Sequence, residues 1–189
     1  MKTLYLLRHA KSSWGDPDLP DHERRLNARG RSAAEAMGRH LAGRKPPPAA
    51  ILASTARRVA ETLEILLPAA GLAALPVIRD RGLYLAEPTL LLGRLRQAPV
   101  EAESLLMVGH NPGLHDFALR LAGEVTPETR SARDRLREAY PTCALAVIAF
   151  PLADDWRDIG WGDGRLEDFV APKRLLSGSD IRNSVVPKA

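Results

Sequence analysis

The sequence predicts an α/β fold, a three-layer α/β/α sandwich with a mainly parallel sheet. Short apolar runs alternate along the chain with longer helix-like stretches, and several of the runs are apolar at consecutive positions. Consecutive apolar residues are typical of strands that are covered on both faces. The alternation of such strands with helices favours a parallel sheet between two helical layers.

The predicted strands and helices are separated in several places by proline. Pro46 to Pro48 end the first long helix, and Pro68 with Gly71 end the second, because proline interrupts the backbone hydrogen bonds of a helix. We expect strands, each a short run rich in apolar residues, at 3–7, 49–53, 75–78, 104–108 and 143–150. We expect helices, each a longer stretch between two of these runs, at 28–42, 56–67, 88–96 and 112–122.

Length and composition indicate one ordinary globular domain. A chain of 189 residues is within the range of a single domain, and it shows no internal repeat and no long linker. Its 45% hydrophobic and 26% charged residues are close to the average for soluble domains. We expect one domain at 1–175, followed by a loosely held C-terminal tail at 176–189, where Ser, Gly, Asp and Pro are mixed.

Cysteine usage and charge restrict the expected location and partners. Cys143 is the only cysteine, which excludes an intramolecular disulfide and favours a reducing cytoplasm. The first apolar run is interrupted at once by Arg8 and His9, so it is too short for a signal peptide or a membrane helix. The net charge of +4 comes from interleaved signs, as at 130–138, which dilutes any basic stripe for nucleic acid. We expect a cytoplasmic protein that binds neither nucleic acid nor a membrane.

Cationic and imidazole groups follow three of the predicted strands. Arg8 and His9 end the first strand, Arg57 and Arg58 lie in the first turn of the helix after the second, and His110 follows the strand at 104–108. Open α/β sheets bind their ligands beyond the carboxyl ends of the strands. We therefore expect these groups to face one crevice.

The positions of these groups indicate an anionic ligand in that crevice. Arg57 and Arg58 in a first helical turn oppose the helix dipole unless an anion lies nearby, and a bound phosphate would supply that anion. Asn111 is a good N-cap and Pro112 a good first helical residue, so the free amide groups of the next helix would point at the same crevice. The crevice is predicted to hold a phosphoryl group.

Each of these residues also has a simpler interpretation. His9 could be a surface histidine at a strand end, and His110 a structural loop residue before a turn. Arg58 could form a surface ion pair with Glu61 or Glu64, which is the usual fate of a helical arginine. Their joint occurrence at corresponding strand ends favours a functional site.

Other phosphatase and hydrolase chemistries lack their sequence requirements. The histidines show no H-x-x-x-H pattern, and Asp16, Asp18 and Asp21 lack the spacing of a calcium loop. No G-x-x-x-x-G-K-[ST] loop for phosphate occurs, and Cys143 lies inside an apolar run, where a buried structural thiol is the default. We expect neither a metal nor a cofactor.

The string Leu7-Arg8-His9-Ala10-Lys11 resembles the R-H-G signature of the histidine phosphatase superfamily, also called the phosphoglycerate mutase-like family. Residues 54–62 resemble the family's S-P-x-x-R-A-x-Q-T segment and place its second arginine at Arg58. Residues 108–113 resemble the segment that holds the second histidine, here His110. The resemblance implies a phosphoglycerate mutase-like fold and a single histidine phosphatase domain at 1–175.

Within that family the sequence is most similar to the small SixA-type phosphohistidine phosphatases. The likeness rests on R-H-A-K-S-S-W at 8–14 and on D-H-E-R-R-L-N-A-R-G at 21–30. Trp156 and residues 169–173 also resemble the end of this group's sequences. The resemblance implies that the substrate is a phosphohistidine.

The chain departs from the family pattern at two small residues and at the general acid. Ala10 replaces the usual glycine and Thr55 the usual proline, changes that leave the cationic set intact. Asp80 lies near the place where the family's acidic residue often falls, and Glu87 is close to it, but neither has a convincing local motif. Asp80 is the first choice and Glu87 the alternative.

The residues predict a two-step covalent mechanism without a metal. His9 attacks phosphorus, Arg8 and Arg58 hold the phosphate oxygens, His110 donates a further hydrogen bond, and Asp80 is the expected acid; water then hydrolyses the phosphohistidine intermediate. The expected partner is a phosphorylated protein that carries phosphohistidine. The alternatives are a broad phosphatase for small phosphorylated molecules and a phosphate-binding module without catalysis.

Overall fold

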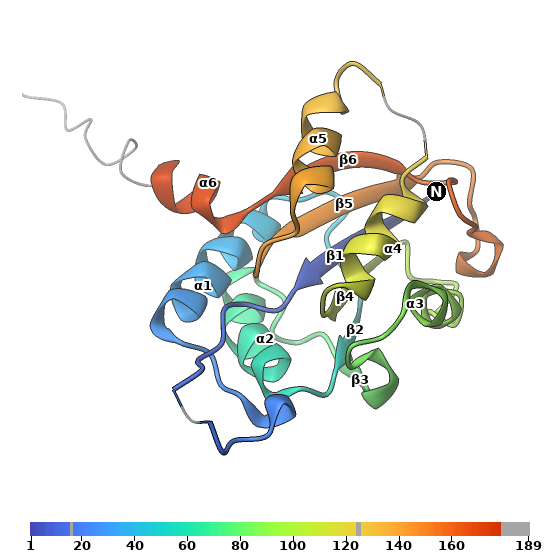
Figure 1. Cartoon of the computed structure of the whole chain (residues 1–189). Helices are drawn as coiled ribbons and strands as arrows, with labels where there is room; N and C mark the ends of the chain where they lie inside the picture. Colours follow the sequence, from blue (N-terminus) through green and yellow to red (C-terminus); the bar gives the residue numbers. More distant parts are fainter. Residues whose placement is uncertain (16, 124–125, 179–189) are drawn as a thin grey trace, which may run out of the picture.

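The computed structural model describes residues 1–15, 17–123 and 126–178. They form one six-stranded sheet in the order β3-β2-β4-β1-β5-β6 (Figure 1). Strands β3, β2, β4 and β1 pair in parallel, whereas β5 and β6 run antiparallel to their neighbours. The predicted mainly parallel sheet is confirmed. The strands are β1 Lys2–Arg8, β2 Ala50–Ser54, β3 Val77–Asp80, β4 Ser104–Gly109, β5 Leu145–Phe150 and β6 Arg165–Val170.

Helices cover both faces of the sheet, as the three-layer prediction requires (Figure 1). One layer consists of α1 Ala28–Ala42, α2 Arg57–Ala69 and α6 Pro172–Gly178. The other consists of α3 Pro88–Leu95, α4 Gly113–Leu121 and α5 Arg130–Glu138. Three short 3-10 helices lie in the connections: η1 Asp21–Glu23, η2 Arg81–Leu83 and η3 Trp156–Asp158.

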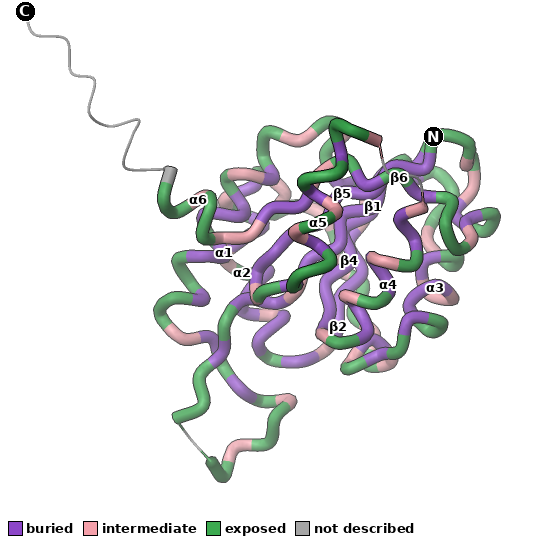
Figure 2. Tube along the Cα trace, turned by 45° about the horizontal axis from the view of Figure 1, so that its top comes forward, coloured by how far each residue is buried: buried purple, intermediate pink, exposed green. Residues whose placement is uncertain are grey.

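The central strand β1 shows why both faces of the sheet are covered. Leu4 and Leu6 pack into the core beneath α3, α4 and α5, while Tyr5 and Leu7 pack into the core beneath α1 and α2. Burial of a leucine side chain stabilises the fold by about 1.5–3 kcal/mol. Figure 2 shows this buried trace along β1, β4 and β5, with exposed segments on the outer helices. Alternate residues of one strand therefore hold both helical layers.

The strand register brings the carboxyl ends of β1, β4 and β2 together at one end of the sheet. Arg8, the last residue of β1, pairs with Gly109, the last residue of β4. On its other side β4 pairs with β2. His9 and His110 therefore leave the sheet side by side, and Ser54 ends β2 next to them.

Helix α1 begins against the loop that follows β1. The Asn27 side chain caps the helix by accepting a 2.9 Å hydrogen bond from the Gly30 amide, and the Asn27 amide donates to the Lys11 carbonyl at 3.0 Å. A Cβ atom at position 30 would lie 2.2 Å from that carbonyl oxygen, so glycine is required. This contact fixes the backbone two residues beyond His9.

The sequence predicts α1 correctly at both ends but does not predict α5 or β6. Helix α5 is rich in charge and buries only Ala132 and Leu136, which leaves a weak hydrophobic pattern. Strand β6 lies at an edge of the sheet and carries Arg165, Glu167 and Asp168. In both elements tertiary packing overrides a composition that favours solvent.

The end of the chain differs in part from the prediction. Helix α6 extends to Gly178, so residues 176–178 of the expected tail are helical. Residues 179–189 lie outside the described residues. None of the described helices is both long enough and apolar enough to span a membrane.

Candidate active site

A cavity of about 510 Å³ lies at the carboxyl edge of β1 and β4. This volume is within the range of pockets that hold small ligands. Four of the five predicted site residues, Arg8, His9, Arg58 and His110, line it together. The other lining side chains, mostly polar or charged, are Lys11, Ser12, Trp14, Asp21, Arg24, Leu85, Asn111 and Thr142.

His9 is held so that its Nε2 atom carries a lone pair. Its Nδ1 atom lies 2.8 Å from the carbonyl oxygen of Ala10, which can only accept, so the ring proton is on Nδ1. Nε2 accepts a 3.3 Å hydrogen bond from Nε of Arg58. Burial lowers the pKa of His9 to about 4; the Ala10 hydrogen bond opposes this shift, and the charges of Arg58 and Arg8 add to it. The ring is therefore neutral at pH 7.

Arg58 is 4% exposed and extends from the start of α2 into the cavity. Its Nη1 donates to the Asp21 carbonyl at 2.6 Å, and its Nη2 donates to the Asp21 carboxylate at 3.0 Å and to His110 at 3.3 Å. The ion pair that Arg58 could have formed with Glu61 is made by Arg57, at 3.1 Å, and Glu61 is buried. The two adjacent arginines therefore serve different purposes.

His110 is 3% exposed, and its ring centroid lies 5.1 Å from that of His9. Because an arginine can only donate, Nδ1 of His110 is the acceptor of the Arg58 bond, and Nε2 donates to the Ser54 hydroxyl at 2.8 Å. Burial, followed by the charge that His9 carries when protonated and by the charge of Arg58, lowers the pKa of His110 to about 3. Both histidines of the cavity are neutral at pH 7.

Arg8 brings a hydrogen-bond donor that lacks a partner. Its Nη1 donates to the Tyr140 carbonyl at 2.8 Å, while its buried Nε has no hydrogen-bond partner among the described residues. A buried donor without a partner costs about 1–3 kcal/mol. An anionic oxygen placed beside this guanidinium would form a charge-assisted hydrogen bond with it.

The segment after His110 differs from the prediction. Helix α4 begins at Gly113, Pro112 occupies the N-cap position, and no side chain caps the helix. The Asn111 side chain instead donates to the Tyr140 carbonyl at 3.0 Å, and its buried Oδ1 has no partner within the described ranges. The prediction that Asn111 caps the helix is wrong, because its amide packs into the cavity wall.

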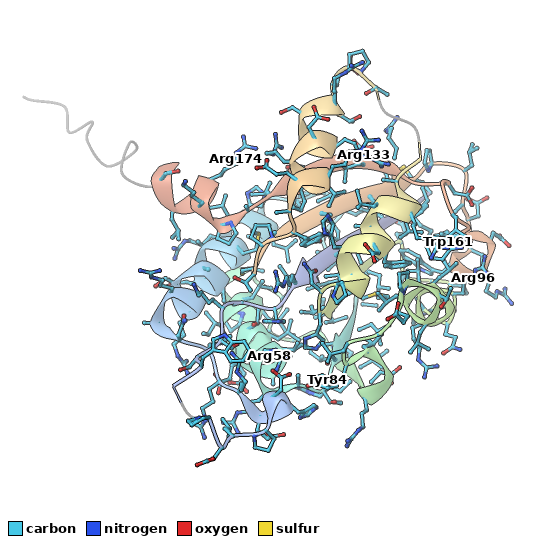
Figure 3. The ribbon with its side chains drawn as sticks, viewed as in Figure 1. Arg58, Tyr84, Arg96, Arg133, Trp161 and Arg174 are labelled. Carbon is cyan, nitrogen blue, oxygen red and sulfur yellow. The ribbon has the colours of Figure 1, made fainter. Side chains whose placement is uncertain are left out.

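Asp21 is the carboxylate that the structure places in this cavity. It accepts hydrogen bonds from Arg24 at 3.0 Å, from Arg58 at 3.0 Å and from the Tyr84 hydroxyl at 2.5 Å. Partial burial raises its pKa, but the bonds from Tyr84 and Arg24 and the charge of Arg58 outweigh this effect and hold the pKa at about 2. Asp21 is therefore an anion at pH 7. Figure 3 shows Arg58 and Tyr84 together at this end of the sheet.

The structure does not bring Asp80 or Glu87 to this cavity. Asp80 ends β3, accepts a 2.7 Å hydrogen bond from the Gly82 amide and forms a 2.5 Å ion pair with Arg94. It lines a separate cavity of about 240 Å³. Glu87 is exposed at the start of α3 and lies in a different hollow of the surface. Neither carboxylate lines the cavity of His9.

Several residues of the site were not predicted from the sequence. Asp21 begins the D-H-E-R-R string, but its spacing alone gives no sign that it faces Arg58. Thr62 is fully buried, accepts from the Ala10 amide at 3.0 Å and donates to the Arg58 carbonyl at 2.6 Å. Tyr84 arrives from the segment after η2, where no motif marks it. Only the folded chain shows that these side chains converge.

Possible metal ligands do not cluster in the described part of the chain. No group of three or more His, Cys, Asp or Glu side chains there could hold a metal ion.

Comparison with known proteins identifies the family. The family model of the histidine phosphatase superfamily (branch 1) matches residues 4–84. An uncharacterized protein of Mycobacterium leprae is 34% identical over 170 residues, which cover 88% of this chain and 100% of that protein. This chain belongs to the histidine phosphatase superfamily. The match to the family model includes Arg8, His9 and Arg58, whereas His110 lies beyond it and is brought beside His9 by the fold.

Solved structures confirm the SixA-type resemblance within this superfamily. A candidate phosphohistidine phosphatase SixA of Agrobacterium tumefaciens is 31% identical, with a TM-score of 0.69, and the match covers 90% of this chain and 98% of that one. A candidate SixA of Nakamurella multipartitia is 28% identical, with a TM-score of 0.74, over 90% of this chain and 96% of that one. The histidine phosphatase described here therefore has the predicted phosphoglycerate mutase-like fold and is a hydrolase.

Proposed function

We propose that this histidine phosphatase hydrolyses phosphohistidine on a protein partner, without a metal and through a phosphoryl group carried on His9. The observation that supports this most directly is the state of His9. Its Nδ1 proton is committed to the Ala10 carbonyl, so Nε2 keeps its lone pair; this accepts a 3.3 Å hydrogen bond from Nε of Arg58, which must give way when Nε2 attacks. A neutral imidazole held in this way is a nucleophile at pH 7 without any further base.

The first step transfers the phosphoryl group to the enzyme. The Nε2 lone pair of His9 attacks phosphorus, and the bond from phosphorus to the leaving nitrogen breaks with its electron pair remaining on that nitrogen. Arg8 and Arg58 stabilise the charge on the equatorial oxygens, which is the usual means of catalysis in phosphoryl transfer. Arg8 lines the cavity with a guanidinium whose Nη1 is held by the Tyr140 carbonyl.

The second step regenerates the enzyme. A water oxygen attacks phosphorus, the bond to Nε2 breaks and its electron pair returns to His9, and the water loses its proton to solvent. His110 can donate to the phosphoryl oxygens only after it gains a proton at Nδ1, because that atom is an acceptor in the structure and Nε2 is bonded to Ser54. A dianionic phosphoryl group beside the ring favours that uptake.

The acid-base character of the cavity supports a phosphoramidate substrate. Among the described residues Asp21 is the carboxylate that lines the cavity, and with a pKa of about 2 it has no proton to give at pH 7. An ester needs a proton on its leaving oxygen, whereas the imidazole of phosphohistidine is basic and can be protonated before it departs. A cavity whose described residues offer no protonated carboxylic acid at pH 7 favours phosphohistidine over phosphate monoesters. The two similar solved structures are named for the same substrate class.

The test compares wild type, His9→Gln and His40→Gln in the presence of a chelator. His40 lies on α1 and does not line the cavity, so it serves as the matched histidine control. Each protein is given a phosphohistidine-bearing protein and an aryl phosphate, and phosphate release is followed. The reaction is also quenched in alkali, where a phosphorus–nitrogen bond survives, and the phosphorylated peptide is mapped.

We expect wild type and His40→Gln to release phosphate in the presence of the chelator and to carry phosphate on the peptide that contains His9. His9→Gln should show neither phosphate release nor a phosphorylated peptide. Phosphohistidine should react faster than the aryl phosphate. Activity in His9→Gln would remove His9 as the nucleophile, and binding of phosphate without turnover would favour a regulatory module. Faster reaction of the aryl phosphate would favour a broad phosphatase. If Asp80→Asn combined with Glu87→Gln abolished phosphohistidine turnover, the argument that no enzyme acid is needed would fail.

A further inference from the structure

One wall of the cavity carries an exposed indole on a fixed cation. Trp14 is 80% exposed, although tryptophan is highly buried on average, and it lines the cavity together with His9. The guanidinium carbon of Arg24 lies 3.1 Å from the centre of its ring. This arrangement supports one face of the indole and leaves most of the side chain open.

Arg24 is held rigidly beneath that ring. It is 6% exposed, and its Nε donates to the Ser13 carbonyl at 2.9 Å. Its Nη1 donates to Asp21 at 3.0 Å and its Nη2 to the Ser12 hydroxyl at 3.0 Å. All three nitrogens are engaged, so the plane of the guanidinium is fixed, and the indole stacked on it is oriented before a substrate arrives.

The cavity has more room than a phosphoryl group needs. Its volume of about 510 Å³ extends from His9 and Arg58 to Trp14. Leu85 lines the same cavity, is 49% exposed and has a φ of 53°, a backbone conformation that costs energy for a branched side chain. The cavity thus has room beyond the cationic end for the group attached to phosphate, and Trp14 and Leu85 are the apolar side chains in its described lining.

We propose that Trp14 determines leaving-group specificity by stacking on a planar ring, the imidazole of a phosphohistidine. This rests on the proposed function, since it assigns the part of the cavity beyond the transferred phosphoryl group. Offset or edge-to-face contact between aromatic rings contributes beyond simple burial, and its usual strength corresponds to about 2- to 12-fold in rate or affinity. An aliphatic leaving group has no ring face and gains little from the indole.

The experiment uses two substrates that share the bond to be broken. Phosphohistidine and phospholysine are both phosphoramidates, but only the first has a planar leaving group. The kcat/KM of each is measured for wild type, Trp14→Ala and Trp14→Phe. For each variant the kcat/KM for phosphohistidine is divided by the kcat/KM for phospholysine. Comparing this ratio between variants cancels the intrinsic difference in reactivity of the two substrates. Thermal unfolding of each variant checks the fold, which a largely exposed side chain should not perturb.

We expect Trp14→Ala to lower kcat/KM for phosphohistidine by about 2- to 12-fold, to leave phospholysine unchanged, and Trp14→Phe to restore most of the loss. An equal loss of kcat/KM for both substrates would show that Trp14 only shields Arg24. An unchanged kcat/KM for phosphohistidine would show that the ring does not contact the leaving group. Either result overturns the proposal. The alkaline quench separates the proposed His9 mechanism from the proposed stacking role of Trp14. If phospho-His9 forms in wild type and Trp14→Ala while the substrate ratio stays constant, only the stacking role fails.

Discussion

The neutral state of His9 predicts that the nucleophile stays available well below pH 7. A histidine in water has a pKa of about 6.5, whereas the pKa of His9 is about 4, lowered chiefly by burial. At pH 5 about 90% of His9 is therefore neutral, compared with about 3% of a histidine with the ordinary pKa. The structure thus predicts a difference of about 30-fold in available nucleophile at that pH.

The measurement is an NMR titration of the imidazole signals between pH 4 and pH 8 without substrate. Substrate ionisation then does not interfere, and the chain has only five histidines to resolve. The His9→Gln variant assigns the signal by its absence. The expected result is a signal that stays at its neutral position down to about pH 5. A midpoint near 6.5 for that signal would refute the argument from burial and from the neighbouring arginines.

The same shift has a consequence for stability. The unfolded chain takes up a proton on this histidine near pH 6.5 and the folded chain near pH 4, so the unfolded state binds more protons between those values. The free energy of unfolding therefore falls as the pH drops from about 6.5 to about 4, by about 3 kcal/mol for His9, with no further loss below that range. Denaturant unfolding at a series of pH values should show a smaller fall for His9→Gln than for wild type.

Two further predictions concern the frame of the site. Thr62→Val leaves the buried Ala10 amide without its acceptor, so we expect the free energy of unfolding to fall by about 1–3 kcal/mol, and an unchanged denaturant midpoint would contradict this. Gly30→Ala places a Cβ atom 2.2 Å from the Lys11 carbonyl oxygen and should lower the free energy of unfolding by about 3 kcal/mol or more. In the control Gly93→Ala the new Cβ meets no atom of the described residues within 4 Å, so this change should be neutral or stabilising. Equal midpoints for the two alanine variants would refute the close approach.

The parts of the fold that the sequence predicts are those with a strong apolar pattern. The parallel strands β1, β2 and β4 are buried on both faces and are read directly as consecutive apolar residues, whereas the edge strand β3 is only partly buried and lies at 77–80 instead of the predicted 75–78. Because parallel strands end at the same edge, the positions of Arg8, His9, Arg58 and His110 along the chain were enough to predict their meeting. Helix α5, in contrast, offers only Ala132 and Leu136 to the core, too few for a periodic signal.

The carboxylate that lines the cavity could not be predicted because carboxylates on loops have no periodicity to place them. Asp80 and Asp21 both lie near strand or helix ends in the sequence, and the resemblance favoured Asp80. The structure pairs Asp80 with Arg94 and turns Asp21 toward Arg58, a contact between residues 37 positions apart. Contacts of this length depend on how η1 folds over α2, which no local pattern in the sequence encodes.

The two arginines of the site are in different states, although the sequence treats them alike. A cation in the first turn of α2 calls for an anion, and in the structure the Asp21 carboxylate already supplies it, while the Asp21 carbonyl accepts a second bond from Arg58. Arg8 has no such carboxylate, and its buried Nε has no partner in the described part of the chain. A phosphoryl group entering the cavity can therefore bind the guanidinium of Arg8 without displacing a carboxylate, while at Arg58 it must share or replace bonds to Asp21. Because an exchanged bond contributes less than a new one, Arg8 should supply more of the binding energy for phosphate and Arg58 more of the orientation of His9.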